Sequence, residues 1–251
     1  MMKYLPKVII VMPAFNAAKT LQRTYEEIPI SYRDSIILVD DCSTDTTVMD
    51  AKNLGIEVIC HSKNLGYGGN QKTCYQAALA QGADIIVMVH PDHQYDASVV
   101  PQLVKPLIHG LADAAFGSRM LGGRPMEGGM PQWKYIANIF LTAAANIIFQ
   151  RYLTEIHSGF RAYTRKYLET VRFEENSNDF VFDTEIIAQG MACKLFFIEV
   201  PISTRYFTDA SSIDFSHSLI YGFNILVVLI RYLLHQLHII RFTQFTPKTN
   251  N

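Results

Sequence analysis

Short apolar runs alternate with longer mixed segments in the first part of the chain. The run at residues 8–12 is continuous and rich in β-branched side chains, which is typical of a strand buried in a parallel sheet. Three further runs of this kind lie at residues 35–39, 56–60 and 84–89. The segments between them predict three helices: one at residues 18–28, one that ends at Leu54, and one at residues 71–81. Ser43 or Thr44 is the expected N-cap of the helix that ends at Leu54. This alternation predicts an α/β fold with a mostly parallel sheet covered by helices on both faces.

The second part of the chain has a different pattern. Its predicted elements are a strand end at 115–119, a glycine-rich loop at 122–129, helices at 131–152 and 182–192, and a strand at 195–200. From 216 to 242 the chain is strongly apolar and basic. We expect a single α/β domain over residues 1–215, followed by a C-terminal helical appendage over residues 216–251.

Polar side chains follow the predicted strands at the points where the strands end. They are Asn16, Asp40, Asp41, Asn64, His90, Asp92 and Gln94. Open parallel sheets bind their ligands at the carboxyl ends of the strands. The repeated placement of polar residues at these ends therefore predicts a binding site along that edge of the sheet.

Composition excludes some classes of partner. The chain has 22 basic and 23 acidic residues and a formal charge of −1, so nothing indicates nucleic-acid binding. The four cysteines lack the spacing of a structural zinc site and are typical of reduced thiols in a cytosolic protein. The apolar stretch that ends at Pro13 is too short for a signal-peptide core. No run reaches the roughly 18 uninterrupted apolar residues of a membrane-spanning helix. We expect a cytoplasmic location.

A candidate metal site follows the strand at 84–89. Asp92 lies two residues after His90 and two before Gln94. Carboxylate and amide oxygens are hard ligands that suit Mg²⁺ or Mn²⁺, ions that also bind phosphate oxygens. The alternative is a solvated turn that Asp92 caps. Zinc bound by His90 and His93 is disfavoured, because no further ligand lies at the usual spacing.

Two more groups indicate a ligand at the same edge. Asp40 and Asp41 repel each other at a buried strand end and need a partner such as a base amide, a sugar hydroxyl or a cation. A helix N-terminal cap formed with Asp45 is the alternative. The glycine-rich loop at 66–69 lets backbone approach a ligand closely. It has no clean Gly-x-Gly-x-x-Gly pattern, which disfavours a hydride-transferring dinucleotide enzyme.

Three arginines are candidates for phosphate binding. Arg119, Arg161 and Arg205 lie in segments of sparse charge, each beside a predicted strand end or turn. A guanidinium group holds a phosphate through two parallel hydrogen bonds. An ordinary surface salt bridge explains any one of them equally well, and the three together favour phosphate.

An ordered set of motifs resembles glycosyltransferase family 2, in the branch similar to dolichol- and polyprenol-phosphate mannose and glucose synthases. The matching segments are residues 12–16, 39–45, 64–69, 90–95, 117–119, 158–163, 179–185 and 199–206. Each motif alone is weak, but together they span roughly residues 8–215 in the expected order. The resemblance implies a GT-A fold, an inverting mechanism and a Mg²⁺ or Mn²⁺ cofactor.

The resemblance also assigns roles to residues. Asp92 and Gln94 are the expected ligands of the metal and diphosphate, and Arg119 and Arg205 the expected phosphate contacts. Asp183 and Glu185 lie where the family has acidic residues near the sugar or the acceptor, and they are expected to act in catalysis with Asp92. The expected nucleotide-binding set, from the resemblance and the strand-end pattern, is Pro13, Phe15, Asn16, Asp40, Asp41, Asn64, Gly66 and Gly69.

The sequence departs from the family pattern at two of these motifs. His90 stands where the Asp-x-Asp motif begins, and Ala17 stands where a glutamate is usual. These changes bear on the identity of the nucleotide and the sugar more than on the reaction class. A nucleotidyltransferase is disfavoured, because its glycine-rich basic loop after the first strand is replaced by residues 13–16.

We expect a transferase that moves a sugar from a UDP- or GDP-sugar to a polyprenyl phosphate at the membrane surface. A soluble hydroxyl acceptor is the alternative, for which Asp183 or Glu185 would act as general base. A sugar-nucleotide-binding protein without catalysis is another. The apolar helices at 131–152 and 216–237 are expected to lie on the inner face of the membrane. A homo-oligomer interface or a buried core is the alternative for these helices.

Overall fold

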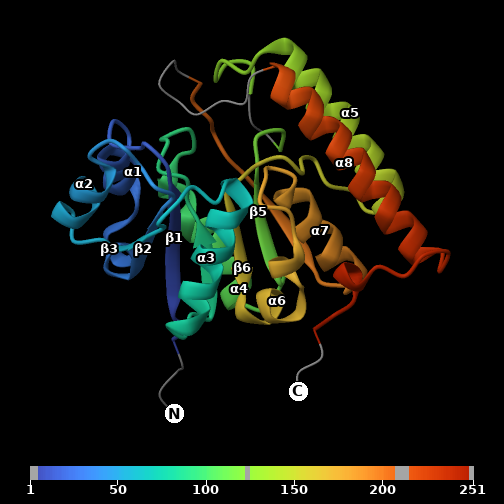
Figure 1. The fold of residues 1–251 in the computed structure, drawn as a ribbon, viewed down its shortest axis with the longest axis horizontal. Helices are drawn as coiled ribbons and strands as arrows, with labels where there is room; N and C mark the ends of the chain where they lie inside the picture. Colours follow the sequence, from blue (N-terminus) through green and yellow to red (C-terminus); the bar gives the residue numbers. More distant parts are fainter. Residues whose placement is uncertain (1–4, 122–124, 207–214, 249–251) are drawn as a thin grey trace.

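A seven-stranded sheet with the order β3-β2-β1-β4-β6-β5-β7 forms the centre of the molecule (Figure 1). The computed structural model describes residues 5–121, 125–206 and 215–248. The strands are β1 (Val8–Ala14), β2 (Ile36–Asp40), β3 (Glu57–Cys60), β4 (Ile85–Met88), β5 (Ala114–Ser118), β6 (Arg161–Thr164) and β7 (Phe197–Pro201). All pairings are parallel except the two made by β6. The prediction of a mostly parallel α/β sheet is confirmed.

Helices cover both faces of the sheet. They are α1 (Leu21–Glu27), α2 (Thr47–Asn53), α3 (Tyr67–Ala80), α4 (Val100–Ile108), α5 (Gln132–Phe149), α6 (Arg165–Thr170), α7 (Phe182–Ala192) and α8 (Phe215–Gln236). Short 3-10 helices η1 (Ile30–Ser35), η2 (Ala97–Val99), η3 (Phe173–Glu175) and η4 (Thr243–Phe245) complete the set. Leu21, Ala51 and Leu103 bring α1, α2 and α4 into the core on one face. Tyr75 and Ile186 bring α3 and α7 into the core on the other.

Strand β6 was not predicted, and it determines where the site lies. It pairs with β4 and β5 in the antiparallel sense, with Met88 opposite Arg161 and Phe116 opposite Arg161. Because β6 runs against its neighbours, its first residue lies beside the last residues of β4 and β5. The loop that precedes β6 therefore reaches the same edge as the polar residues that follow β4.

Two expectations about helix starts are wrong. The helix expected at 71–81 begins at Tyr67, so Gly68 and Gly69 of the predicted loop lie in its first turn and Gly66 is its N-cap. Neither Ser43 nor Thr44 caps α2. Instead, the carboxylate of Asp45 accepts hydrogen bonds from the backbone N–H and hydroxyl of Thr47. The Ser43 hydroxyl accepts a hydrogen bond from a backbone N–H after β1, so it ties two strand ends together.

Helices α5 and α8 lie side by side as an outer layer (Figure 1). Their contact includes an edge-to-face pair between Phe149 and Tyr232, with ring centroids 4.9 Å apart. The inner side of α8 is buried in the main core through Ile225 and Leu229, and Phe245 brings the following segment back to that core. Among the described residues one helical segment, Ser218–Gln236, is long and apolar enough to cross a membrane by length and composition. The core helix of a soluble protein, which is mostly buried, passes the same test, whereas 22% of this segment is buried.

Candidate active site

A cavity of about 490 Å³ opens at the carboxyl edge of the sheet, beneath α5 and α8. Four of the predicted functional residues line it together: Asp92, Gln94, Arg119 and Asp183. The rest of the wall is Tyr67, His90, Tyr95, Trp133, Lys134, Ala137, Asn138, Leu141, His157, Gly159, Phe180, Tyr206, Ser218 and Tyr221. The cavity thus joins the ends of the strands to the inner side of the outer helices.

The segment after β4 carries the two expected metal ligands. The Asp92 carboxylate accepts a hydrogen bond from the Gln94 backbone N–H at 3.1 Å, which closes a tight turn. His93 in this turn has a positive φ of 57°. The Gln94 carbonyl accepts a hydrogen bond from the Arg205 N–H at 2.9 Å, and Tyr95 bridges to Thr204. These contacts fix the turn against the segment that follows β7.

His90 also lines the cavity, as a ring that burial keeps from being protonated. Its ring stacks on Tyr67, with centroids 5.5 Å apart and an interplanar angle of 5°. Burial lowers its pKa, which outweighs the opposing effects of Asp92 and Asp183. The position that the family pattern gives to a carboxylate therefore carries a neutral ring.

Asp183, in the first turn of α7, is held by three donors. The Tyr67 hydroxyl donates to Oδ2 at 2.8 Å, Gln71 Nε2 donates to Oδ1 at 3.2 Å, and Arg161 Nη1 lies 3.4 Å from Oδ1. Burial and the adjacent Asp183 raise the pKa of Tyr67 well above its usual value. Both carboxylate oxygens are thus already engaged, which suits a group that orients its neighbours.

The interpretation of Arg161 as a phosphate ligand is wrong. Its side chain is buried and donates hydrogen bonds to the carbonyls of Ile156, Ser158 and Asp183. The guanidinium also lies over the Phe116 ring, 5.3 Å from the ring centroid, a distance at which a cation is attracted to the aromatic face. Arg161 holds the loop before β6 in place and faces the core.

Glu185 does not line the cavity. Its carboxylate accepts hydrogen bonds from the Ser177 N–H at 2.6 Å and from Gln244 Nε2 at 3.0 Å. Residues two apart on a helix point in different directions. Asp183 therefore faces the cavity, and Glu185 faces the segment that follows α8. The placement gives no route by which Glu185 acts on a substrate in this cavity.

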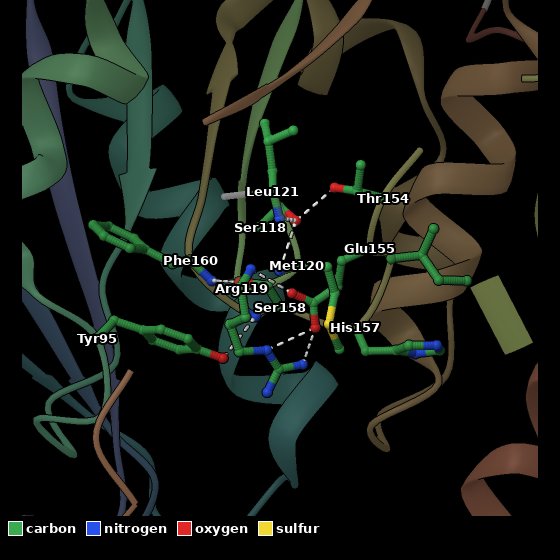
Figure 2. Close-up of polar contacts among 12 residues, drawn as sticks. Tyr95, Ser118, Arg119, Met120, Leu121, Thr154, Glu155, His157, Ser158 and Phe160 are labelled. Carbon is green, nitrogen blue, oxygen red and sulfur yellow. Dashed lines mark hydrogen bonds and ion pairs between the residues drawn. The ribbon is translucent and has the colours of Figure 1, made fainter. Parts of the chain in front are cut away.

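Arg119 is a buried cation with an acidic partner (Figure 2). Its Nε donates to Glu155 Oε1 at 2.7 Å, Nη2 also contacts this carboxylate, and Nη1 donates to the Tyr206 hydroxyl at 2.8 Å. Burial acts to lower the pKa of Arg119, but Glu155 outweighs it and raises the pKa. Lys134 on α5 also lines the cavity, and burial together with Arg119 lowers the pKa of its amine.

Arg205 lies outside the cavity wall. Its Nη1 pairs with Glu27 of α1 at 2.8 Å and lies 3.4 Å from His93 Nε2. Its backbone is nonetheless part of the site, because the N–H binds the Gln94 carbonyl. The prediction of a phosphate contact requires the side chain to leave Glu27, and it stays a prediction.

The residues expected to bind the nucleotide gather at the ends of β1 and β2. The Asp40 carboxylate is buried; Oδ2 accepts a hydrogen bond from the Ser43 N–H, and Oδ1 has no partner among the described residues. Phe15 is 54% exposed, and Pro13 is buried in β1. Asn16 has a positive φ of 52°, and its side-chain oxygen accepts a hydrogen bond from Thr44. Within the described part of this set, Asp40 thus has a buried oxygen without a partner, and Phe15 has an exposed ring.

Asp41 and Asn64 hold the loop between β3 and α3. The Asp41 carboxylate accepts hydrogen bonds from His61 Nδ1 at 2.7 Å and from the backbone N–H groups of Leu65 and Gly66. Asn64 donates to the Asp41 carbonyl at 3.2 Å. Their side chains are used within the protein, so a direct nucleotide contact by either one stays a prediction.

Packing within the fold explains why glycines occupy the start of α3. Gly66 has a φ of +83°, and a Cβ there would lie 2.7 Å from the Asn178 carbonyl oxygen. A Cβ on Gly69 would lie 2.8 Å from the Leu65 side chain. The first turn of α3 therefore packs backbone to backbone against the segment before α7. The role of Gly66 and Gly69 at the nucleotide stays a prediction.

Several cavity residues with polar side chains were not singled out from the sequence, among them Tyr67, Lys134, Asn138, His157 and Tyr221. They come from four separate segments and have no shared spacing. A lysine inside an otherwise apolar helix was the one local signal, since Lys134 is the only charged residue of α5.

Comparisons with known proteins agree with this geometry. The family model described as Glycosyl transferase family 2 matches residues 9–172. An uncharacterised protein of Methanocaldococcus jannaschii is 31% identical over 224 residues, covering 89% of this chain and 91% of its own length. The UDP-N-acetylglucosamine–dolichyl-phosphate N-acetylglucosaminyltransferase of Methanococcus voltae is 26% identical over 216 residues, covering 79% of this chain and 86% of its own.

Among solved structures, the glucosyl-3-phosphoglycerate synthase of Mycobacterium tuberculosis has a similar fold. Its complex with Mn²⁺, UDP and phosphoglyceric acid aligns with a TM-score of 0.69 and 18% identity, covering 91% of this chain and 78% of that one. The fold is therefore of the GT-A type that the motifs implied. The chain belongs to glycosyltransferase family 2 and is a glycosyltransferase.

Proposed function

We propose that this glycosyltransferase moves a sugar from a UDP- or GDP-sugar to a polyprenyl phosphate at the membrane surface. The observation that carries the proposal is the single cavity that joins the metal-ligand turn after β4 to the exposed apolar pair α5 and α8. A lipid acceptor needs this connection, because its phosphate must reach the sugar while its chain stays in an apolar medium.

The donor is expected to lie along the ends of β1, β2 and β4. The unpartnered Asp40 Oδ1 is an acceptor for an N–H of the base, and the exposed Phe15 ring supplies an apolar surface beside it. Within the described residues no group of three or more His, Cys, Asp or Glu side chains forms a complete metal cluster. This fits Mg²⁺ or Mn²⁺, which commonly bind one or two protein oxygens and complete their coordination with substrate phosphates.

Asp92 and Gln94 would hold that ion, which when bound would neutralise the departing nucleoside diphosphate. The solved complex of the structural relative contains Mn²⁺ and UDP, which supports a divalent ion with a uridine nucleotide. Asp183 keeps Tyr67 and Gln71 in place beside the reacting groups through its two accepted hydrogen bonds.

The acceptor phosphate is expected at Arg119 and Lys134, the two cations on the cavity wall. Glu155 already balances the charge of Arg119, so Lys134 supplies the charge that an anion would balance. The lowered pKa of Lys134 has burial as its main cause and Arg119 as the second, and a bound phosphate would counter both. A phosphate oxygen is already anionic, so the attack needs no general base. This agrees with an Asp183 carboxylate that is fully hydrogen-bonded.

The outer face of α5 and α8 supports a membrane location. Seven of the described large apolar side chains there are more than half exposed: Ile136, Phe140, Ile147, Leu219, Ile220, Phe223 and Ile230. Neither helix contains an aspartate or a glutamate. An apolar helix face with basic residues at its margins lies in the plane of the lipid headgroups. We propose peripheral attachment through this face, with a homo-oligomer interface as the alternative occupant.

The test combines donor, metal and acceptor. The purified chain is incubated with Mn²⁺ and labelled UDP- or GDP-sugars, in separate arms with polyprenyl phosphate in detergent, with glycerol 3-phosphate, and without acceptor. We expect a labelled lipid that requires the metal and disappears in Asp92→Asn. Transfer of label to glycerol 3-phosphate alone would contradict the proposal that the acceptor is a lipid. Donor binding without any turnover would support a non-catalytic binding protein.

A further inference from the structure

Two residues that line the cavity each have a buried nitrogen atom without a hydrogen-bond partner within the described residues. The atoms are Nε2 of His157, in the loop before β6, and Nδ2 of Asn138, on α5. Buried polar groups are nearly always hydrogen-bonded, because an unsatisfied group loses its water without compensation. Two such atoms from separate elements on one cavity indicate a ligand that carries oxygen acceptors.

The loop that carries His157 is fixed on both sides. The Glu199 carboxylate accepts hydrogen bonds from the backbone N–H groups of Thr154 and Glu155 at 2.8–3.0 Å. Arg161 donates to the carbonyls on either side of His157. The imidazole therefore cannot satisfy Nε2 by a shift of its backbone. In Figure 2 its ring points away from Arg119, so it extends the site beyond the cation.

The ring is neutral and has a defined neighbour. Burial, followed by the nearby Arg119 and Arg161, lowers the pKa of His157 to about 3. Nδ1 lies 3.4 Å from the Tyr221 hydroxyl of α8. When the hydroxyl donates to Nδ1, the single proton of the neutral imidazole is on Nε2. The unpartnered atom is then a donor, as is the amide nitrogen of Asn138.

We propose that His157 is a specificity-determining residue of the acceptor site, donating from Nε2–H to an oxygen of the acceptor's phosphate ester, with Tyr221 as the residue that positions its ring. The inference rests on the proposed function, since it assigns a contact to the same acceptor. A neutral donor beside Arg119 and Lys134 would make the site selective for the position of the acceptor oxygen. Cations attract any anion, whereas a fixed N–H requires an oxygen at one place.

The test uses the full chain and separates acceptor from donor. His157→Leu removes the donor, His157→Gln restores an N–H, and Tyr221→Phe removes the hydroxyl that sets the tautomer. We expect the acceptor KM to rise about tenfold in His157→Leu, the loss of about one hydrogen bond. The donor KM should be unchanged, and His157→Gln should recover part of the loss. His109→Leu, the same exchange at an exposed histidine, is the matched control and should behave as the wild type.

The assay is run with polyprenyl phosphate and with glycerol 3-phosphate, so that the two sources of a phosphate ester are distinguished. A tenfold rise in acceptor KM with either one supports the inference, and a rise for glycerol 3-phosphate alone removes only the lipid part of the proposed function. An unchanged acceptor KM in His157→Leu, or an equal rise in donor KM, overturns the inference while the proposed function stands. If His157→Leu does not fold, Tyr221→Phe decides, since a purely structural tyrosine would not raise the acceptor KM selectively.

Discussion

Because the His157 ring is neutral in the folded protein, the free energy of unfolding depends on pH. Substitution of His157 should remove this part of the pH dependence. The folded-state pKa of this histidine is about 3, against an ordinary value of 6.5. Between these two pH values the unfolded chain binds a proton that the folded chain does not. The free energy of unfolding is therefore unaffected by His157 above pH 6.5 and decreases as the pH falls below that value. From these two values the loss between pH 7 and pH 5 is about 2 kcal/mol.

The assay is urea unfolding at pH 7 and at pH 5, with the wild type, His157→Gln and His109→Gln. Glutamine does not titrate, so His157→Gln should lose about 2 kcal/mol less than the wild type over this range. His109 is exposed, and His109→Gln should follow the wild type. All other titrating groups are common to the three proteins and cancel in the comparison. An equal loss in the wild type and His157→Gln would refute the neutral buried ring.

Three further predictions follow from packing and exposure. Arg161→Lys keeps the charge but cannot reach the three carbonyls, so it should cost roughly 3 kcal/mol of stability, measured by urea unfolding. Gly68→Ala should lower the melting temperature well below that of Gly222→Ala. A Cβ on Gly68 would collide with the Ser177 carbonyl oxygen, whereas one on Gly222 would meet only the Leu141 side chain at 3.7 Å. Equal melting temperatures would count against this packing. Phe223→Asp should reduce flotation with anionic liposomes, whereas Leu111→Asp, an exposed apolar residue away from the outer helices, should not. A protein that stays at the bottom of the gradient even as the wild type would remove the membrane proposal.

The local sequence pattern was sufficient to predict the parallel strands in the first half of the chain. The continuous β-branched runs of β1, β2 and β4 are buried on both faces, so each strand is visible from its own residues. Strand β6 is short and contains Arg161, whose guanidinium donates to two carbonyls of the loop before β6 and to the carbonyl of Asp183 in α7. Its place between β4 and β5 depends on pairing partners more than 40 residues away. No periodicity within four residues carries that information.

The site residues also differ in whether the local sequence predicts their positions. Asp92 and Gln94 follow a visible strand, so their meeting at the sheet edge was predictable. The three arginines have similar sequence surroundings, and the structure separates them by partner: Arg119 lines the cavity, Arg161 faces the core and Arg205 pairs with Glu27. Burial and long-range partners decide these roles, and neither is encoded near the residue itself.

Asp92 is central to the proposed function, because it would hold the divalent ion through which the donor diphosphate binds. Calorimetric titration of UDP- and GDP-sugars, with and without Mn²⁺, tests it directly in the wild type, in Asp92→Asn and in the exposed control Asp34→Asn. We expect the metal to increase donor affinity at least about tenfold in the wild type and the control, and to have little effect in Asp92→Asn. Equal metal-dependent affinity in all three proteins would contradict the account.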